Sequence, residues 1–154
     1  MHFTHQLGLL GELKAAAKFV ELGFSIYTSI SDGVDPFDFI AHRDNRLIKV
    51  QVKSTSSKTA SRNSYPITLR TVTIHKSRNV YTPFDPSKCD VLAIYIKPLD
   101  TVCFILTTIL NNTGSIYLRE LPPKNKNQYK SWIISEHTDL SKAIQSLQFR
   151  DGRI

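Results

Sequence analysis

Three polar residues between positions 37 and 53 could together bind a metal ion and a phosphate. The segment alternates as a hairpin, and a turn centred between residues 44 and 45 pairs position 38 with position 51. Asp38 then lies opposite Gln51, and Lys53 shares their face of the strand two residues further on. The intervening residues predict a core-facing side: Phe37, Phe39, Ile48, Val50 and Val52. The polar face also fits an ordinary solvent-facing Asp–Lys pair, so the spacing alone leaves both interpretations open.

A carboxylate on the first helix could complete this group. Residues 6–22 predict a helix that Gly23 ends, with an inward apolar stripe at helical spacing formed by Leu9, Leu13, Ala16 and Val20. Glu12 lies at the border of that stripe, away from the other charged residues of the helix. It could therefore reach over the sheet, or turn outward into solvent.

The positive charge of the chain is concentrated in one segment. The chain has a net charge of +7, and residues 43–78 hold nine Lys or Arg against the single acid Asp44, which is +8 in 36 residues. Such a block favours a polyanionic partner, most commonly nucleic acid, although a solvated basic face is the alternative. The chain contains no P-loop and no dinucleotide-binding fingerprint.

The element pattern predicts an α/β (α+β) fold, a mixed sheet flanked by helices, in one domain spanning residues 1–154. Strands are expected at 24–28, 37–41, 47–54, 65–74, 90–97 and 102–106, followed by a short helix or turn and a small strand within 107–118. Thr138 is expected to cap a last helix at 139–148. Cys89 and Cys103 are expected to be reduced core residues.

Three short motifs resemble the PD-(D/E)XK nuclease superfamily. They are Gly11-Glu12 in the opening helix, Pro36-Phe37-Asp38 before one strand, and Val50-Gln51-Val52-Lys53-Ser54 on the next. The likeness runs from about Leu7 to Leu106, and within the superfamily the chain is similar to the small homing endonucleases associated with group I introns. The resemblance implies a restriction-endonuclease-like fold.

The resemblance also implies a catalytic group and a metal. The catalytic residues would be Glu12, Asp38, Gln51 and Lys53, with Mg²⁺ (or Mn²⁺) held by Asp38, Gln51, the Val52 carbonyl and Glu12. Gln51 departs from the usual acid of the motif, and its amide oxygen can bind a hard cation without adding charge. Lys53 would position the attacking water, and the products would carry 5′-phosphate and 3′-hydroxyl ends.

The expected substrate is double-stranded DNA, with a pseudo-palindromic site cut by a homodimer or a dimer of dimers. The hairpin at 90–106 or the last helix could supply the subunit interface. DNA contacts are expected from about 55–80 and 119–131, with residues 67–74 as a ribbon in the major groove. The expected contacts are Lys58, Arg62, Arg70, Thr71, Thr73, Lys76, Arg78, Lys124, Lys126 and Lys130. His5, near Glu12, could contact the scissile phosphate.

Two other functions remain compatible with the residues: a restriction or Holliday-junction-resolving nuclease of the same fold, and a catalytically inactive DNA-binding protein. The longest apolar run, Val91–Ile96, is far shorter than the roughly 18 residues that cross a bilayer. No secretory signal is evident at the start of the sequence. We therefore expect no membrane association and a cytoplasmic location, at the nucleoid when bound to DNA.

Overall fold

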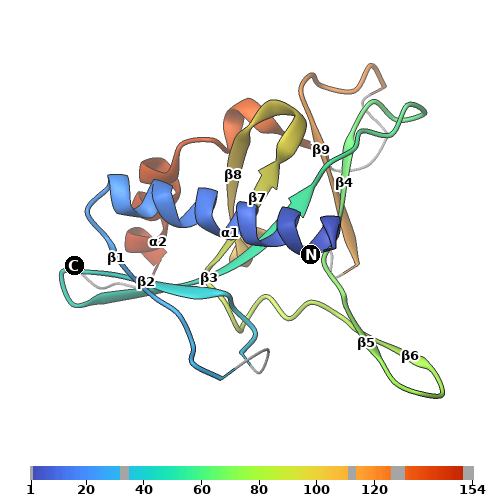
Figure 1. The fold of residues 1–154 in the computed structure, drawn as a ribbon. Coiled ribbons are helices and arrows are strands. Elements are labelled where there is room, and N and C mark those ends of the chain that lie inside the picture. Colours follow the sequence, from blue (N-terminus) through green and yellow to red (C-terminus); the bar gives the residue numbers. More distant parts are fainter. Residues whose placement is uncertain (1, 32–34, 111–113, 126–130, 151–154) are drawn as a thin grey trace.

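A five-stranded mixed sheet forms the centre of the molecule (Figure 1). The computed structural model describes residues 2–31, 35–110, 114–125 and 131–150, with 148–150 described by their backbone alone. The strand order is β1-β2-β3-β7-β8, in which only β3 and β7 run parallel. These strands are β1 (Ser25–Tyr27), β2 (Phe39–Arg43), β3 (Arg46–Thr55), β7 (Val91–Ile96) and β8 (Thr101–Leu106).

The remaining elements lie around this sheet. A three-stranded sheet has the order β10-β9-β4, and β5 and β6 form a separate hairpin that projects from the body (Figure 1). Their bounds are β4 (Tyr65–Thr68), β5 (Thr71–Ile74), β6 (Asn79–Thr82), β9 (Ser115–Arg119) and β10 (Trp132–Ile133). The helices are α1 (Phe3–Glu21) and α2 (Leu140–Arg150), with short 3₁₀ turns η1 (Lys97–Leu99), η2 (Thr107–Ile109) and η3 (Ile134–Glu136). The predicted α+β class is thus confirmed. Among the described residues, neither helix is long and apolar enough to cross a membrane.

Two hydrophobic cores lie on opposite faces of β7 and β8. Val91, Ala93 and Tyr95 join the core shared with α1 and α2, whereas Leu92 and Ile94 join the core shared with β4 and β9. Alternate residues of a strand point to opposite faces, so a strand covered on both faces is apolar throughout. Because the β7–β8 hairpin is buried in this way, it offers no apolar surface for a subunit interface.

The apolar side of helix α2 is likewise packed into the core. Its residues Leu140, Ile144 and Leu147 are buried in the α1–α2 core as predicted. The helix is capped by Asp139, whose Oδ1 accepts a hydrogen bond of 3.1 Å from the Lys142 backbone N–H, and not by Thr138. The expectation that α2 supplies an apolar interface therefore has no support from these residues.

The face that α1 turns inward differs from the predicted one. The buried residues of the helix are Gly11, Ala15 and Phe19, whereas Leu9, Leu13 and Val20 are 49%, 60% and 57% exposed. The predicted inward stripe is therefore wrong for these three residues, whereas Ala16, its fourth member, is half-buried against the core.

Close packing at Gly11 explains this choice of face. A Cβ atom at Gly11 would lie 2.0 Å from Ser54 Oγ and 3.3 Å from Tyr95 Cβ. The helix therefore approaches β3 and β7 more closely than a leucine would allow. Further along, the Phe19 ring packs edge-on against three other aromatic rings of this core, those of Phe24, Phe39 and Phe104.

The predicted β2–β3 hairpin is confirmed in register. Phe39 pairs with Val50 and Arg43 with Arg46. Asp44 and Asn45 have φ angles of 52° and 60°, as a two-residue type I′ turn requires. The predicted core positions of the two strands are buried, but Phe37 is only half-buried and its ring lies 5.7 Å from the Lys49 ammonium.

The predicted strand 65–74 is two strands with different surroundings. Residues 65–68 pair with β9, and Leu69 is fully buried in the core beneath that sheet. The chain then leaves the body at Arg70 and forms the β5–β6 hairpin. A ribbon in a DNA groove can therefore comprise only the part beyond Leu69.

Candidate active site

The candidate site lies where β2 separates from β3. β2 pairs with β3 only as far as Val50, whereas β3 continues to Thr55 with β7 as its neighbour on the other side. The edge of β3 beyond Val50 is thus left open on the β2 side. Asp38 stands at this point, and its backbone N–H donates a hydrogen bond of 2.8 Å to the Val50 carbonyl.

The Asp38 carboxylate is fixed by two donors from β3. Its Oδ2 accepts hydrogen bonds from Gln51 Nε2 at 2.8 Å and from the Val52 backbone N–H at 2.6 Å. Both bonds use one oxygen, which leaves Oδ1 available to another ligand. The Gln51 amide uses its nitrogen here, so its oxygen Oε1 is the end that can accept a cation.

The backbone of Val52 points toward the same open edge. Lys49 faces β7, since its N–H donates to Asp90 Oδ2 at 2.8 Å and its carbonyl accepts from the Asp90 N–H at 2.9 Å. Backbone groups of successive strand residues point to alternate edges, so Val50 and Val52 face the β2 side. The Val52 carbonyl oxygen therefore lies at the edge beside Asp38.

Lys53 lies on the same face of β3 as Gln51, half-buried near Asp38. Burial lowers the pKa of its ammonium group, while the charge of Asp38 opposes that shift. In the described part of the chain Lys53 forms no ion pair with Asp38 within 4.0 Å, so it does not neutralise the carboxylate by direct contact. Burial is also the main cause of a raised pKa of Asp38, against the Val52 hydrogen bond and the charge of Lys53, which lower it.

Glu12 approaches this group from α1, at an exposed position. The pKa of its carboxyl group is raised first by partial burial and second by the charge of Asp38, so the two carboxylates lie within electrostatic range. Gly11, the preceding residue, is where α1 comes into contact with Ser54 and hence with this end of β3. The structure therefore brings together the predicted group of Glu12, Asp38, Gln51, Val52 and Lys53.

The donor set suits a hard cation, with less charge than a site of three acids. Among the described residues no cluster of three His, Cys, Asp or Glu side chains is present. Two carboxylates, one amide oxygen and one backbone carbonyl are oxygen ligands of the kind that Mg²⁺ binds. Burial raises the pKa of both Asp38 and Glu12 and so disfavours their charged forms, and a bound cation would favour those forms.

The predicted DNA-contacting residues fall into two groups. Thr71, Thr73, Lys76 and Arg78 are exposed on the β5–β6 hairpin, and the Arg70 guanidinium at its base lies 4.6 Å from the centre of the Tyr81 ring. The second group, beside β9, contains Lys58, Arg62 and Lys124. Lys126 and Lys130 lie outside the described residues.

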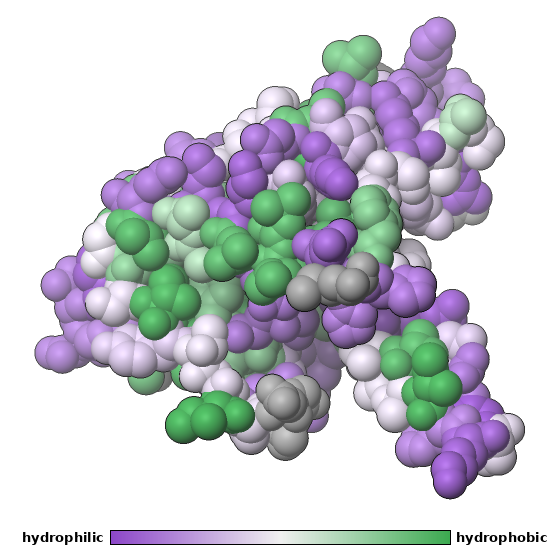
Figure 2. Space-filling model, viewed as in Figure 1, coloured by the Kyte–Doolittle hydropathy of each residue, from purple (hydrophilic) through white to green (hydrophobic). Residues whose placement is uncertain are grey.

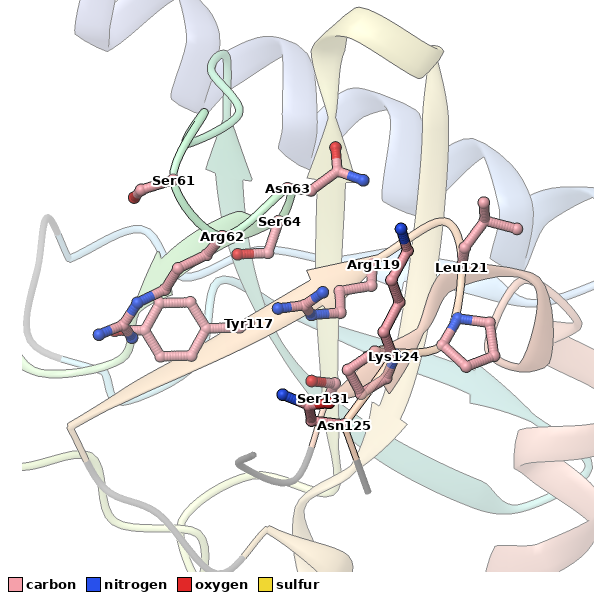
Figure 3. A pocket seen from close by; sticks show the side chains of 12 residues that line it. Ser61, Arg62, Asn63, Ser64, Tyr117, Arg119, Leu121, Lys124, Asn125 and Ser131 are labelled. Carbon is pink, nitrogen blue, oxygen red and sulfur yellow. The ribbon is translucent and has the colours of Figure 1, made fainter. Parts of the chain in front are cut away.

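Two members of the second group line a pocket of about 840 Å³ (Figure 3), and no residue of the Asp38 site is among its lining residues. Arg62 and Lys124 line it, and the Arg62 guanidinium lies 5.2 Å from the centre of the Tyr117 ring. Lys58 forms an ion pair of 2.6 Å with Glu120, so part of its charge is already compensated. Arg119 also lines the pocket, and its buried Nε has no hydrogen-bond partner among the residues that the structure describes.

Two residues near these sites, Cys89 and Arg119, were not predicted from the sequence. Cys89 is buried within electrostatic range of Lys53 and Asp38, and burial raises the pKa of its thiol to about 12, so the thiol stays neutral. Its lone position in an apolar stretch gave no signal, although the prediction that Cys89 and Cys103 are free and buried is confirmed. Arg119 lies within the expected 119–131 region, but nothing in its spacing distinguished it from a surface cation.

Comparisons with known proteins identify the fold and the family of this chain. A solved structure titled as that of a bacterial homing endonuclease, I-Ssp6803I, superimposes with a TM-score of 0.75 at 18% sequence identity, over 97% of this chain and 99% of that one. This likeness confirms the fold. A search of curated proteins gave no match. A family model described as PD-(D/E)XK endonuclease matches residues 2–139, which is most of the chain. The chain therefore belongs to the PD-(D/E)XK endonuclease family.

Proposed function

We propose that this protein is a divalent-metal-dependent endonuclease that cuts double-stranded DNA at specific sites, of the homing type. The observation that carries the proposal is the Asp38 carboxylate, held at the open edge of β3 beside the Gln51 amide and the Val52 carbonyl. The structural likeness to a homing endonuclease supports this type over a restriction or junction-resolving nuclease.

Four groups would hold the cation: Asp38, the Gln51 amide oxygen, the Val52 carbonyl and Glu12. A bound Mg²⁺ or Mn²⁺ supplies Lewis-acid chemistry, in that it neutralises phosphate charge and lowers the pKa of a coordinated water. Asp38 is held in place by its two hydrogen bonds from β3, so the ligand oxygen needs little reorganisation.

Lys53 acts on the water and the phosphate. Its ammonium group donates hydrogen bonds to the attacking water and to a phosphate oxygen. As the water oxygen bonds to phosphorus, the water gives up a proton to solvent, and Lys53 stabilises the negative charge that grows on the phosphate. The bond from phosphorus to the 3′ oxygen then breaks, and that oxygen takes up a proton from solvent. The products carry a 5′-phosphate and a 3′-hydroxyl, as the family resemblance implies.

DNA is held by the two basic groups outside the site. The β5–β6 hairpin, with Arg70 at its base and Lys76 and Arg78 at its tip, enters a groove, and the β9 pocket receives a backbone phosphate next to Arg119. One site cuts one strand, so cleavage of both strands of a pseudo-palindromic target calls for a homodimer or a dimer of dimers.

Cleavage of a plasmid library with randomised inserts tests the proposal. We expect Mg²⁺-dependent linearisation of a small subset of plasmids, whose sequenced ends define one site, and no linearisation by Asp38→Asn. Lys142→Ala, which removes an exposed cation from α2, is the matched control and should cut at the wild-type rate. Binding without cleavage in any divalent ion would reject the endonuclease activity, and a preference for four-way junctions over linear duplex would reject the homing type.

A further inference from the structure

Helix α1 carries a second apolar face that is largely exposed. We call Leu9, Leu13, Ala16 and Val20 the outer stripe. Its three large members are 49%, 60% and 57% exposed, and Ala16 is half-buried where the stripe borders the core. Figure 2 shows apolar side chains gathered along α1 on the surface. Contiguous apolar surface of this kind marks a contact site more often than isolated exposed leucines do.

The balanced charge of α1 allows a second copy of the positively charged chain to dock there. Helix α1 holds two acids and two lysines, whereas the chain as a whole carries +7 and residues 43–78 carry +8. Both lysines are paired within one chain, Lys14 with Asp100 at 2.9 Å and Lys18 with Glu21 at 3.4 Å. Two copies therefore meet through α1 with little mutual repulsion, and their basic segments stay free for DNA.

The outer stripe of one copy is also complementary to the outer stripe of a second copy that runs antiparallel to it. If two α1 helices pack antiparallel about a two-fold axis near residues 14 and 15, Leu9 of one copy faces Val20 of the other. Leu13 then faces Ala16, so a large side chain lies against a small one at both central contacts. This is the pattern of an isologous interface, in which the same patch serves both copies.

We propose that a second copy of this chain docks antiparallel on the outer stripe of α1 and forms a two-fold dimer. A two-fold axis perpendicular to the helices places the same border of the outer stripe in both copies on the same side of the dimer. Glu12 lies on one such border, so both candidate active sites face the same side, as two cuts in one duplex require. The inference deepens the proposed function and rests on it for this purpose, whereas the contact itself can be measured without DNA.

Sedimentation velocity on the DNA-free protein tests the contact. We expect a dimer of the wild type at micromolar concentration, and for Leu13→Glu a dimer dissociation constant at least about tenfold larger, or ~1.4 kcal/mol. Leu47→Glu is the matched control, because Leu47 on β3 is 63% exposed and lies outside the stripe. A monomeric wild type throughout this range, or a Leu13→Glu dimer as tight as the wild type, would overturn the proposal.

Cysteine cross-linking tests the antiparallel arrangement and does not depend on the charged variant. An oxidised mixture of Leu9→Cys and Val20→Cys proteins should give a disulfide-linked dimer, and neither variant alone should. The native Cys89 and Cys103 are 4% and 0% exposed and should add little background. Cross-linking of Leu9→Cys to itself would reject the antiparallel pairing. A dimer that cross-links as expected but cuts no DNA would reject the proposed function and leave the interface standing.

Discussion

The two hairpins, β2–β3 and β5–β6, differ in what lies around them. The β2–β3 hairpin lies within the five-stranded sheet, and Phe39, Val50 and Val52 bury its apolar side under α1. The β5–β6 hairpin has no neighbouring strand in the described structure, and of its paired residues only Val80 is even half-buried. One hairpin is therefore held rigidly from both sides, and the other is free to adapt.

This difference matches the demands of two tasks. Hydrolysis needs ligands and a cation fixed within a fraction of an ångström, and packing around β2–β3 supplies that order. Reading a DNA groove needs reach and exposed polar groups, and the projecting β5–β6 hairpin supplies those. We therefore expect changes in β2–β3 to affect the chemical step and changes in β5–β6 to affect binding.

The largest expected effect belongs to Lys53. Lys53→Ala should lower the single-turnover cleavage rate by about 100- to 1000-fold, because it removes a group that stabilises charge in the transition state. The dissociation constant for target DNA, measured in Ca²⁺, should stay within about twofold, ~0.4 kcal/mol. An equal loss in binding would place Lys53 among the DNA-binding residues. It would contradict the assignment of the chemical step to β2–β3 and of binding to β5–β6.

The β5–β6 hairpin should behave in the opposite way. Lys76→Ala combined with Arg78→Ala should weaken DNA binding and lower the salt dependence of log K by about one for each phosphate that the variant no longer neutralises. The cleavage rate at saturating DNA should not change, since neither side chain lies at the Asp38 site. Binding measured over a range of salt concentrations decides this, and an unchanged slope would remove the hairpin tip from the interface.

Gln51 offers a smaller effect within the candidate site. Gln51→Glu restores the acid that the family motif usually carries, and it should lower the Mg²⁺ concentration for half-maximal cleavage by about threefold to tenfold, because added ligand charge tightens cation binding. Gln145→Glu, on the exposed side of α2, adds the same charge elsewhere and is the control. A Mg²⁺ requirement unchanged by Gln51→Glu would exclude this side chain from the ligand set.

Local signals in the sequence predicted the β2–β3 hairpin well. Alternating apolar residues and the Asp44-Asn45 turn define one register, and a slip by one residue would expose the whole core face. Asp38 and Gln51 could therefore be paired from the sequence alone.

The face of α1 could not be predicted in the same way. Its periodicity favoured Leu9, Leu13 and Val20 as inward residues, but the contact of Gly11 with Ser54 decides the orientation. That contact joins residues 43 positions apart, and no local pattern encodes it. The mistaken stripe was still informative, because an apolar face that the fold leaves exposed is available to a partner.

The smallest expected effect concerns stability, and it compares two aspartates with opposite pKa shifts. The folded-state pKa of Asp38 is raised, chiefly by burial, so the folded protein loses stability as the pH rises from the unfolded pKa through the folded one. The pKa of Asp100 is lowered by hydrogen bonds from Lys14 and Tyr95, so its contribution is present above the unfolded pKa and is lost as the pH falls through the folded pKa. At neutral pH the two carboxylates therefore act in opposite directions.

Thermal unfolding of the metal-free protein in a chelator tests this contrast. At neutral pH Asp38→Asn should unfold at a higher temperature than the wild type, and Asp100→Asn at a lower one. Asparagine tolerates the left-handed backbone of Asp100, at φ 45°, so that variant isolates the lost charge. Added Mg²⁺ should then stabilise the wild type more than Asp38→Asn, because ligand binding to the folded state raises its stability and only the wild type keeps the carboxylate ligand. If Asp38→Asn is destabilised as much as Asp100→Asn, the Asp38 carboxylate stabilises the fold. Its position at the open edge of β3 would then be explained by stability and would not indicate a role in catalysis.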